Sequence, residues 1–437
     1  KKHFKKIALC LFAAALLLGS VLSAGADAPY KTFTFDGYGY MIQTQTAYLP
    51  YETITKFDDE ALSSPSDVHV TDEGKIYVAD TGNARIVVGD LEGNLLQTMG
   101  EGTLVSPRGV FVTENGHVYV ADRDAEAVFE FGADGEMLNR YGKPESPLYG
   151  DSLSFLPIKL VVNDAGIMYV ICESNTNGIV EISPIEGGTF LGYFGTNMAS
   201  SSPMIIIRRA FATKAQRAKM VSNIPSTPDN LCIDNKGLIY TVTRGEEYNT
   251  LKRLNIAGKN VIEPDTYDDI PAAVAAGNHD NVFMVSQQGF VYEFNSEGEA
   301  LFVFGGSDDG NQRVGLCTVV SAIDVDLQDR LYILDSDKAQ IQVYEPTEFT
   351  DLLHKALNLY STGRYTESKA PLEEVLKMNS MFDYANMAMG RAYFQEENYE
   401  MAQYYAKLAK DYTGYSEATW EIRNLWLKKW IVPIIWA

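Results

Sequence analysis

The stretch IYVADTGNARI, Ile76–Ile86, decides the fold. Two short runs of strand-forming residues flank a polar turn that contains Asp80, Gly82 and Asn83. Asp and Asn side chains bond their own backbone and Gly tolerates a positive φ, so the stretch predicts a β-hairpin. A near copy, VYVADRDAEAV, begins at Val118. The recurrence predicts an internal repeat rather than an isolated hairpin.

The two copies share a period of 42 residues, measured from Pro65 to Pro107 or from Asp80 to Asp122. Weaker copies follow along the chain. The aromatic residue of the second strand marks six units: Tyr77, Tyr119, Tyr169, Tyr240, Phe283 and Tyr332. Each unit has room for four short antiparallel strands, and such units bury both faces only when they stack around an axis. The sequence therefore predicts an all-β six-bladed propeller over residues 27–346.

The ends of a propeller must be joined. The sixth unit stops after its third strand, whereas Tyr30–Gln43 shows strand alternation ahead of the first unit. We expect Tyr30–Gln43 to supply the outer strand of the sixth blade.

The turn residues Asp80 and Asn83, with Arg85, have the composition of a functional site. Part of the same pattern recurs at Asp122 and Asp335. A feature repeated from unit to unit is better explained as a structural lock of the hairpin.

The segment Pro65–Ile86 resembles the NHL repeat, with a Pro, an apolar strand, Asp-x-x-Gly, Ile-Tyr-Val-Ala-Asp and Thr-Gly-Asn-x-Arg-Ile in order. The resemblance extends over about 64–345. It is strong in the first unit, good in the second and sixth, and degenerate in the other three. It implies the same six-bladed NHL-type propeller as the spacing.

After Pro346 the apolar period changes from two residues to about 3.6, which predicts helices. Tyr365 and Tyr399 are 34 residues apart, and this part of the chain resembles a pair of tetratricopeptide repeats. We assign residues 347–422 to this all-α segment. Two repeats are fewer than such stacks need alone, so we expect them to lean on the propeller or on a last helix. The resemblance implies a groove for a protein partner.

Both ends of the chain carry membrane-related patterns. Residues 1–26 have the basic, apolar and small-residue layout of a secretory signal peptide. Residues 423–437 place Trp and Lys before an apolar run and are interpreted as the start of a C-terminal transmembrane segment, or alternatively as a helix end packed on its own domain. We expect an exported protein on the extracytoplasmic face of the membrane. A net charge of -22 argues against nucleic acid as a partner.

The spacing between Tyr169 and Tyr240, 71 residues, exceeds the period. The excess predicts a helical insertion at about 203–222. Its cations Arg208, Arg209 and Arg217 are predicted to bind a partner or, equally, to neutralise nearby carboxylates.

The innermost strand of each unit starts near the repeat proline, so the polar residues there are predicted to line the channel mouth and bind a ligand: Asp67, Arg108, Lys159, Asp229 and Asn230. Six-bladed lactonases similar to gluconolactonase hold calcium in this channel, and Asp67, Asp229 and Asn230 offer the oxygen atoms that calcium prefers. Two cations in the same set favour a small polar ligand or a solvated funnel instead. We therefore predict no metal and no catalytic residue. The histidines, in an inner strand, two turns and the first helix, are predicted to form no recurring cluster: His69, His117, His279 and His354.

These features favour a binding or scaffold protein over an enzyme. The whole layout resembles propeller proteins of Gram-positive bacteria found beside carbohydrate uptake transporters, which implies a carbohydrate or an ABC transporter component as partner. The alternative is a calcium-dependent hydrolase of the lactonase or esterase kind, acting in the propeller channel. Only the hydrolase requires Asp67, Asp229 and Asn230.

Overall fold

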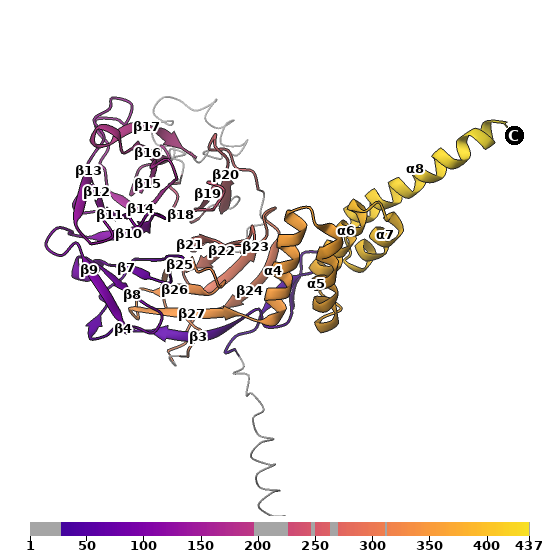
Figure 1. The fold of residues 1–437 in the computed structure, drawn as a ribbon, viewed down its shortest axis with the longest axis horizontal. Helices are drawn as coiled ribbons and strands as arrows, with labels where there is room; N and C mark the ends of the chain where they lie inside the picture. Colours follow the sequence, from indigo (N-terminus) through magenta and orange to yellow (C-terminus); the bar gives the residue numbers. More distant parts are fainter. Residues whose placement is uncertain (1–27, 196–225, 246–249, 263–269, 311–312, 437) are drawn as a thin grey trace, which may run out of the picture.

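The computed structural model describes residues 28–195, 226–245, 250–262, 270–310 and 313–436. Six antiparallel sheets stand around a common axis, and a helical segment extends from one side of the ring (Figure 1). The predicted architecture, a six-bladed β-propeller followed by an all-helical segment, is confirmed.

Each blade runs in chain order from the axis outward. The first blade contains β6 (Asp67–Val70), β7 (Ile76–Asp80), β8 (Arg85–Gly89) and β9 (Leu95–Met99). The second contains β10 (Pro107–Val112), β11 (Val118–Asp122), β12 (Ala127–Phe131) and β13 (Met137–Tyr141). The third contains β14 (Pro157–Val162), β15 (Met168–Cys172), β16 (Ile179–Ser183) and β17 (Thr189–Phe194).

The fourth blade has three described strands, β18 (Asn230–Ile233), β19 (Ile239–Val242) and β20 (Leu251–Leu254). The fifth contains β21 (Pro271–Ala276), β22 (Val282–Ser286), β23 (Phe290–Phe294) and β24 (Ala300–Gly305), extended outward by β1 (Phe33–Phe35) and β2 (Met41–Gln43). The sixth contains β25 (Val320–Val325), β26 (Leu331–Asp335), β27 (Gln340–Pro346) and, from the N-terminal part of the chain, β3 (Tyr48–Ile54). The small hairpin of β4 (Lys56–Phe57) and β5 (Glu60–Ala61) leads from β3 into the first blade.

The closing strand is β3, so the assignment of this role to Tyr30–Gln43 was wrong. β3 pairs antiparallel with β27, from Ile54 opposite Ile341 to Tyr48 opposite Pro346. The earlier segment folds back on itself because the Asp36 carboxylate accepts hydrogen bonds from the backbone N–H groups of Tyr38 and Tyr40. The resulting short hairpin of β1 and β2 joins the outer edge of the fifth blade instead.

The hairpin lock at Asp80 is confirmed. One carboxylate oxygen accepts a hydrogen bond of 2.7 Å from the backbone N–H of Ser63, and the other accepts from Asn83 Nδ2 at 2.8 Å and Arg85 Nε at 3.0 Å. Asp122 and Asp335 accept backbone N–H groups in the same places of their own blades. The carboxylate therefore ties the second strand of a blade to the chain that enters the blade.

The helical segment contains five helices: α4 (Glu348–Ser361), α5 (Tyr365–Met378), α6 (Asp383–Gln395), α7 (Tyr399–Leu408) and α8 (Tyr412–Trp436). Tyr365 and Tyr399, the residues that gave the period, open α5 and α7. α8 projects away from the ring (Figure 1). In the part of the chain that the structure describes, no helix combines the length and the apolarity needed to cross a membrane.

The first helix of each pair packs on the fifth blade, as expected for a stack too short to stand alone. The ring of Phe382, ahead of α6, stacks on Phe302 of β24 with centroids 5.9 Å apart, and Phe349 of α4 closes the cluster. Arg391 of α6 forms an ion pair of 2.7 Å with Glu299. The β1–β2 turn adds a clamp, because Lys410 Nζ reaches both Asp383 and Asp36.

Replacing the lock residue tests the repeat. Asp80→Ala is expected to lower the free energy of unfolding by about 3 kcal/mol, because the backbone N–H of Ser63, Asn83 Nδ2 and Arg85 Nε lose their shared buried acceptor while Arg85 keeps its ion pair with Glu60. The control Asp59→Ala removes an exposed carboxylate 3.5 Å from Lys56 and is expected to cost under about 0.5 kcal/mol. Urea unfolding measures both, and equal losses would contradict the lock.

Replacing Phe382 tests the docking of the helices. Phe382→Ala is expected to destabilise the interface by about 3 to 5 kcal/mol, since the ring is fully buried. Limited proteolysis should then release the helical segment while the propeller resists. Tyr404→Ala, on the exposed side of α7, is the control and should leave the cleavage pattern unchanged.

Candidate functional site

Asp67 and Lys159, predicted at the channel mouth from the first and third blades, bind each other. Lys159 Nζ lies 2.5 and 2.7 Å from the two carboxylate oxygens, one of which also accepts the backbone N–H of Val110 at 2.9 Å. The side chains are only 1% and 13% exposed. Burial raises the pKa of Asp67, and the Lys159 ammonium opposes that rise. Both oxygens of this carboxylate are engaged by protein groups.

The other predicted channel residues do not join this pair. Asp229 accepts a hydrogen bond of 2.6 Å from the backbone N–H of Arg244. Asn230 is buried, and its Oδ1 has no hydrogen-bond partner among the described residues. Arg108 is exposed. The predicted partner residues Arg208, Arg209 and Arg217, like the signal sequence, lie outside the described residues.

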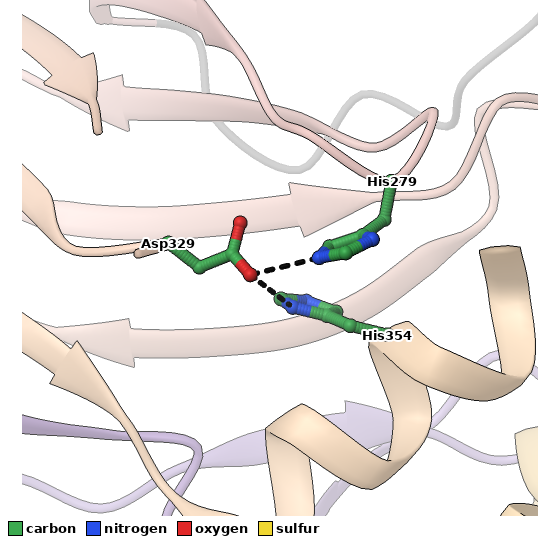
Figure 2. Close-up of side chains that lie close together, drawn as sticks. All are labelled: His279, Asp329 and His354. Atoms are coloured by element: carbon green, nitrogen blue, oxygen red, sulfur yellow. Dashed lines mark hydrogen bonds and ion pairs between the residues drawn. The ribbon is translucent and has the colours of Figure 1, made fainter. Parts of the chain in front are cut away.

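A second cluster joins His279, Asp329 and His354 (Figure 2). From the sequence, the histidines were predicted to form no recurring cluster, and the meeting of two of them at one place was not foreseen. His279 comes from the β21–β22 turn of the fifth blade, Asp329 from the β25–β26 turn of the sixth, and His354 from α4. Asp329 Oδ2 lies 2.8 Å from His279 Nε2 and 3.8 Å from His354 Nδ1. The imidazole centroids are 4.9 Å apart. The three groups thus converge from three separate elements.

Glu293 of β23 holds the far side of His354. Its Oε1 lies 2.6 Å from His354 Nε2 and also accepts a hydrogen bond of 2.7 Å from Asn281 Nδ2. His354 and Glu293 are almost completely buried. Burial lowers the pKa of His354, but the carboxylates of Glu293 and Asp329 outweigh it and raise the pKa to about 10. The imidazole therefore sits in a strongly negative, water-poor position.

The pKa of Asp329 shifts in the opposite direction from that of His354. Burial raises the pKa of the Asp329 carboxyl, but the hydrogen bonds from His279 and Asn278, together with the nearby His354, outweigh burial and bring the pKa well below its ordinary value. Asn278 Nδ2 donates to the second carboxylate oxygen at 2.7 Å. Asp329 is accordingly an anion at all physiological pH values.

The cluster lies on a cavity of about 340 Å³, lined also by Asp351, Lys355, Asn358 and Leu359 of α4. Burial raises the pKa of Asp351, with the nearby negative charge of Asp329 adding to the rise and His354 opposing it. The cavity gives a small polar molecule access to the edge of the cluster.

One turn position of the six repeats carries a signal of this site that our predictions from the sequence did not use. Three residues before the strand aromatic, the first four blades have a glycine in the left-handed region: Gly74, Gly116, Gly166 and Gly237. The fifth and sixth have Asp280 and Asp329 there, at φ 56° and 59°. A side chain in this region is costly, so its use in two adjacent blades marks a special turn. The contribution of His354 carries no comparable signal.

Comparison with known proteins bears on the fold. The family model of the NHL repeat matches residues 62–88. Streptogramin B lyase is 14% identical, with 72% of this chain and 87% of that chain covered and a TM-score of 0.42. A virginiamycin B lyase from Staphylococcus aureus is 12% identical over 71% of this chain and 86% of that chain, with a TM-score of 0.41.

Hydrazine synthase of Kuenenia stuttgartiensis is 14% identical over 68% of this chain and 77% of that chain, also with a TM-score of 0.41. The comparison with curated proteins gives no match. Structural likenesses this weak transfer no activity. The chain therefore carries an NHL repeat within a six-bladed propeller, and its function must be argued from its own residues.

A double-variant experiment tests the channel pair. Asp67→Leu is expected to destabilise the propeller by about 3 to 5 kcal/mol, because the Lys159 ammonium stays buried without its partner. Asp67→Leu combined with Lys159→Met is expected to recover most of this loss, since a buried pair replaced by apolar groups is often neutral. Urea unfolding of the two variants checks the expectation, which fails if the double variant is as unstable as the single one.

Proposed function

We propose that this protein is a binding scaffold of the extracytoplasmic membrane face, attached to the membrane through α8. The observation that carries the proposal is that α8 has exposed aromatic and cationic side chains. The helix projects from the rest of the molecule (Figure 1). The propeller supports a binding role in general. Export and membrane attachment go beyond the fold and rest on the two ends of the sequence.

Three tryptophans of α8 are about half exposed to solvent. Trp420, Trp426 and Trp430 are 55%, 53% and 43% exposed, and Ile431 is also exposed. An exposed apolar surface of this kind is typical of a site that contacts a membrane or a partner protein. Lys428 and Lys429 lie in the same part of the helix and are exposed. Trp and Lys in this combination are typical of the membrane–water boundary.

The partner-binding surface follows from how the helices are docked. Tetratricopeptide repeats bind partners along their helix faces. In this chain the faces of α4 and α6 that pack on the propeller are covered and cannot bind a partner. Phe349 and Leu353 of α4 and Met389 of α6 are buried there. The exposed sides of α5 and α7, with Tyr404 as an example, are left for a protein. A carbohydrate ligand and a link to an ABC transporter rest on the resemblance of the whole layout.

The hydrolase alternative has less support. A calcium ion at the channel mouth would have to displace the Lys159 ammonium from both oxygens of Asp67. Calorimetric titration with calcium tests this directly. Tight binding that Asp67→Ala abolishes would favour the hydrolase over the scaffold.

Vesicle binding tests the membrane attachment. In the chain that begins at Asp27, Lys428→Gln combined with Lys429→Gln is expected to weaken binding to phosphatidylglycerol vesicles about thirtyfold, since each lysine near an anionic surface contributes about 1 kcal/mol. Trp426→Ser should weaken binding to both anionic and neutral phosphatidylcholine vesicles. Sedimentation of protein with vesicles measures both.

The matched control is Lys377→Gln combined with Lys407→Gln, which removes two exposed lysines from α5 and α7. This control is expected to bind as the unchanged chain does. The proposal is wrong if the unchanged chain stays in solution with both kinds of vesicle, or if the two double variants lose binding equally.

A further inference from the structure

We propose that His279, Asp329 and His354 form a binding site for one divalent transition-metal ion, Zn²⁺ fitting best, at the seam between the propeller and α4. The ligand atoms are His279 Nε2, Asp329 Oδ2 and His354 Nδ1. The remaining coordination position faces the cavity and is open to water or a small polar ligand. This site is distinct from the propeller channel and goes beyond the scaffold function.

The spacing of the ligand atoms suits the ion. All three lie within 4.8 Å of one another, with Asp329 Oδ2 at 2.8 Å and 3.8 Å from the two histidine nitrogens. Ligand atoms about 2.1 Å from a tetrahedral ion lie about 3.4 Å apart. Small side-chain rotations bring the set to that geometry. Two imidazoles and one carboxylate with an open position are a ligand set for zinc, whereas calcium prefers oxygen atoms alone.

An independent observation points to a missing partner. His354 is 1% exposed, and its Nδ1 has no hydrogen-bond partner among the described residues although it faces Asp329. At 3.8 Å the Asp329 carboxylate is too far for an ordinary hydrogen bond. An ion between the two would satisfy both. His279 Nδ1 is also buried without a partner, on the side of the ring away from Asp329 Oδ2.

The surroundings hold the ligands in place. Glu293 accepts the Nε2 hydrogen of His354, which leaves Nδ1 to donate its lone pair to the ion. Asn278 holds the second oxygen of Asp329. A carboxylate behind a histidine ligand is the usual arrangement at protein zinc sites.

The second blade provides a contrast. Glu130 lies opposite Tyr119 as Glu293 lies opposite Phe283, and it too binds a histidine, His117, at 2.7 Å. Among the described residues no third ligand completes a metal site there. His117 is therefore a matched control that has the same kind of histidine–carboxylate pair.

The test is calorimetric titration of the full chain with Zn²⁺ after treatment with a chelator. We expect one Zn²⁺ per chain. His279→Ala is expected to weaken binding by at least about 100-fold, because losing a ligand costs more than the 10- to 100-fold loss that follows removal of a group behind a ligand. His117→Ala should bind as the unchanged chain does.

Asp329→Gly guards against misfolding. Four blades have glycine at this position with a positive φ, so the variant keeps the turn while it loses a ligand. It should bind Zn²⁺ as weakly as His279→Ala does. Absorption of bound Co²⁺ should be that of a tetrahedral ion without sulfur charge-transfer bands, which separates this site from Cys172, Cys232 and Cys317, the cysteines of the described residues, all buried or half-buried.

The proposal is overturned if the unchanged chain binds no Zn²⁺, or if His279→Ala and folded Asp329→Gly both bind it as tightly as the unchanged chain does. Either result would make the cluster an ion-pair network that only docks α4. Sulfur charge-transfer bands with Co²⁺ would also overturn it, because they would place the ion at a cysteine.

Discussion

The pairing of β3 with β27 is the constraint on which the rest of the structure depends. It closes the ring, so that Val78 and Val87 of the first blade pack with Leu334 and Val343 of the sixth in one core. It also sets the course of α4, which follows β27 directly. The backbone carbonyl of Ala47, next to β3, accepts hydrogen bonds from the backbone N–H of Thr347 and the hydroxyl of Thr350. The strand that closes the ring therefore also fixes the position of α4 and with it that of His354.

The sequence predicted what repeats and missed what does not. The period, the six blades and the lock at Asp80 follow from local patterns that recur, so each copy checks the others. The closing strand was assigned to the wrong segment because alternation alone does not distinguish β3 from the β1–β2 hairpin. The difference lies in the Asp36 turn and in burial of Tyr48, whose ring stacks on Phe304 with centroids 4.8 Å apart.

The two candidate sites show why side-chain partners are harder to predict than folds. Asp67 and Lys159 are 92 residues apart, and both were predicted at the channel mouth. Their ion pair depends on how the first and third blades are placed around the axis, which no local pattern shows. His279 and His354 are 75 residues apart in sequence (354 − 279) and belong to different domains. The trace in the repeats is the replacement of the turn glycine by Asp280 and Asp329, which points to the two turns rather than to the partner from α4.

The seam between ring and helices has a thermodynamic consequence. Stacks of helical repeats need about three units to be stable alone. Here the fifth blade covers α4 and α6 through Phe302, Phe382 and the ion pairs of Arg391. The cluster of His279, Asp329 and His354 exists only in this docked arrangement, because one of its members belongs to α4. Any ligand of the cluster therefore stabilises docking, by about 2.7 kcal/mol when its concentration is 100 times its dissociation constant. Binding of a ligand to this cluster would therefore hold the helical segment more firmly against the propeller.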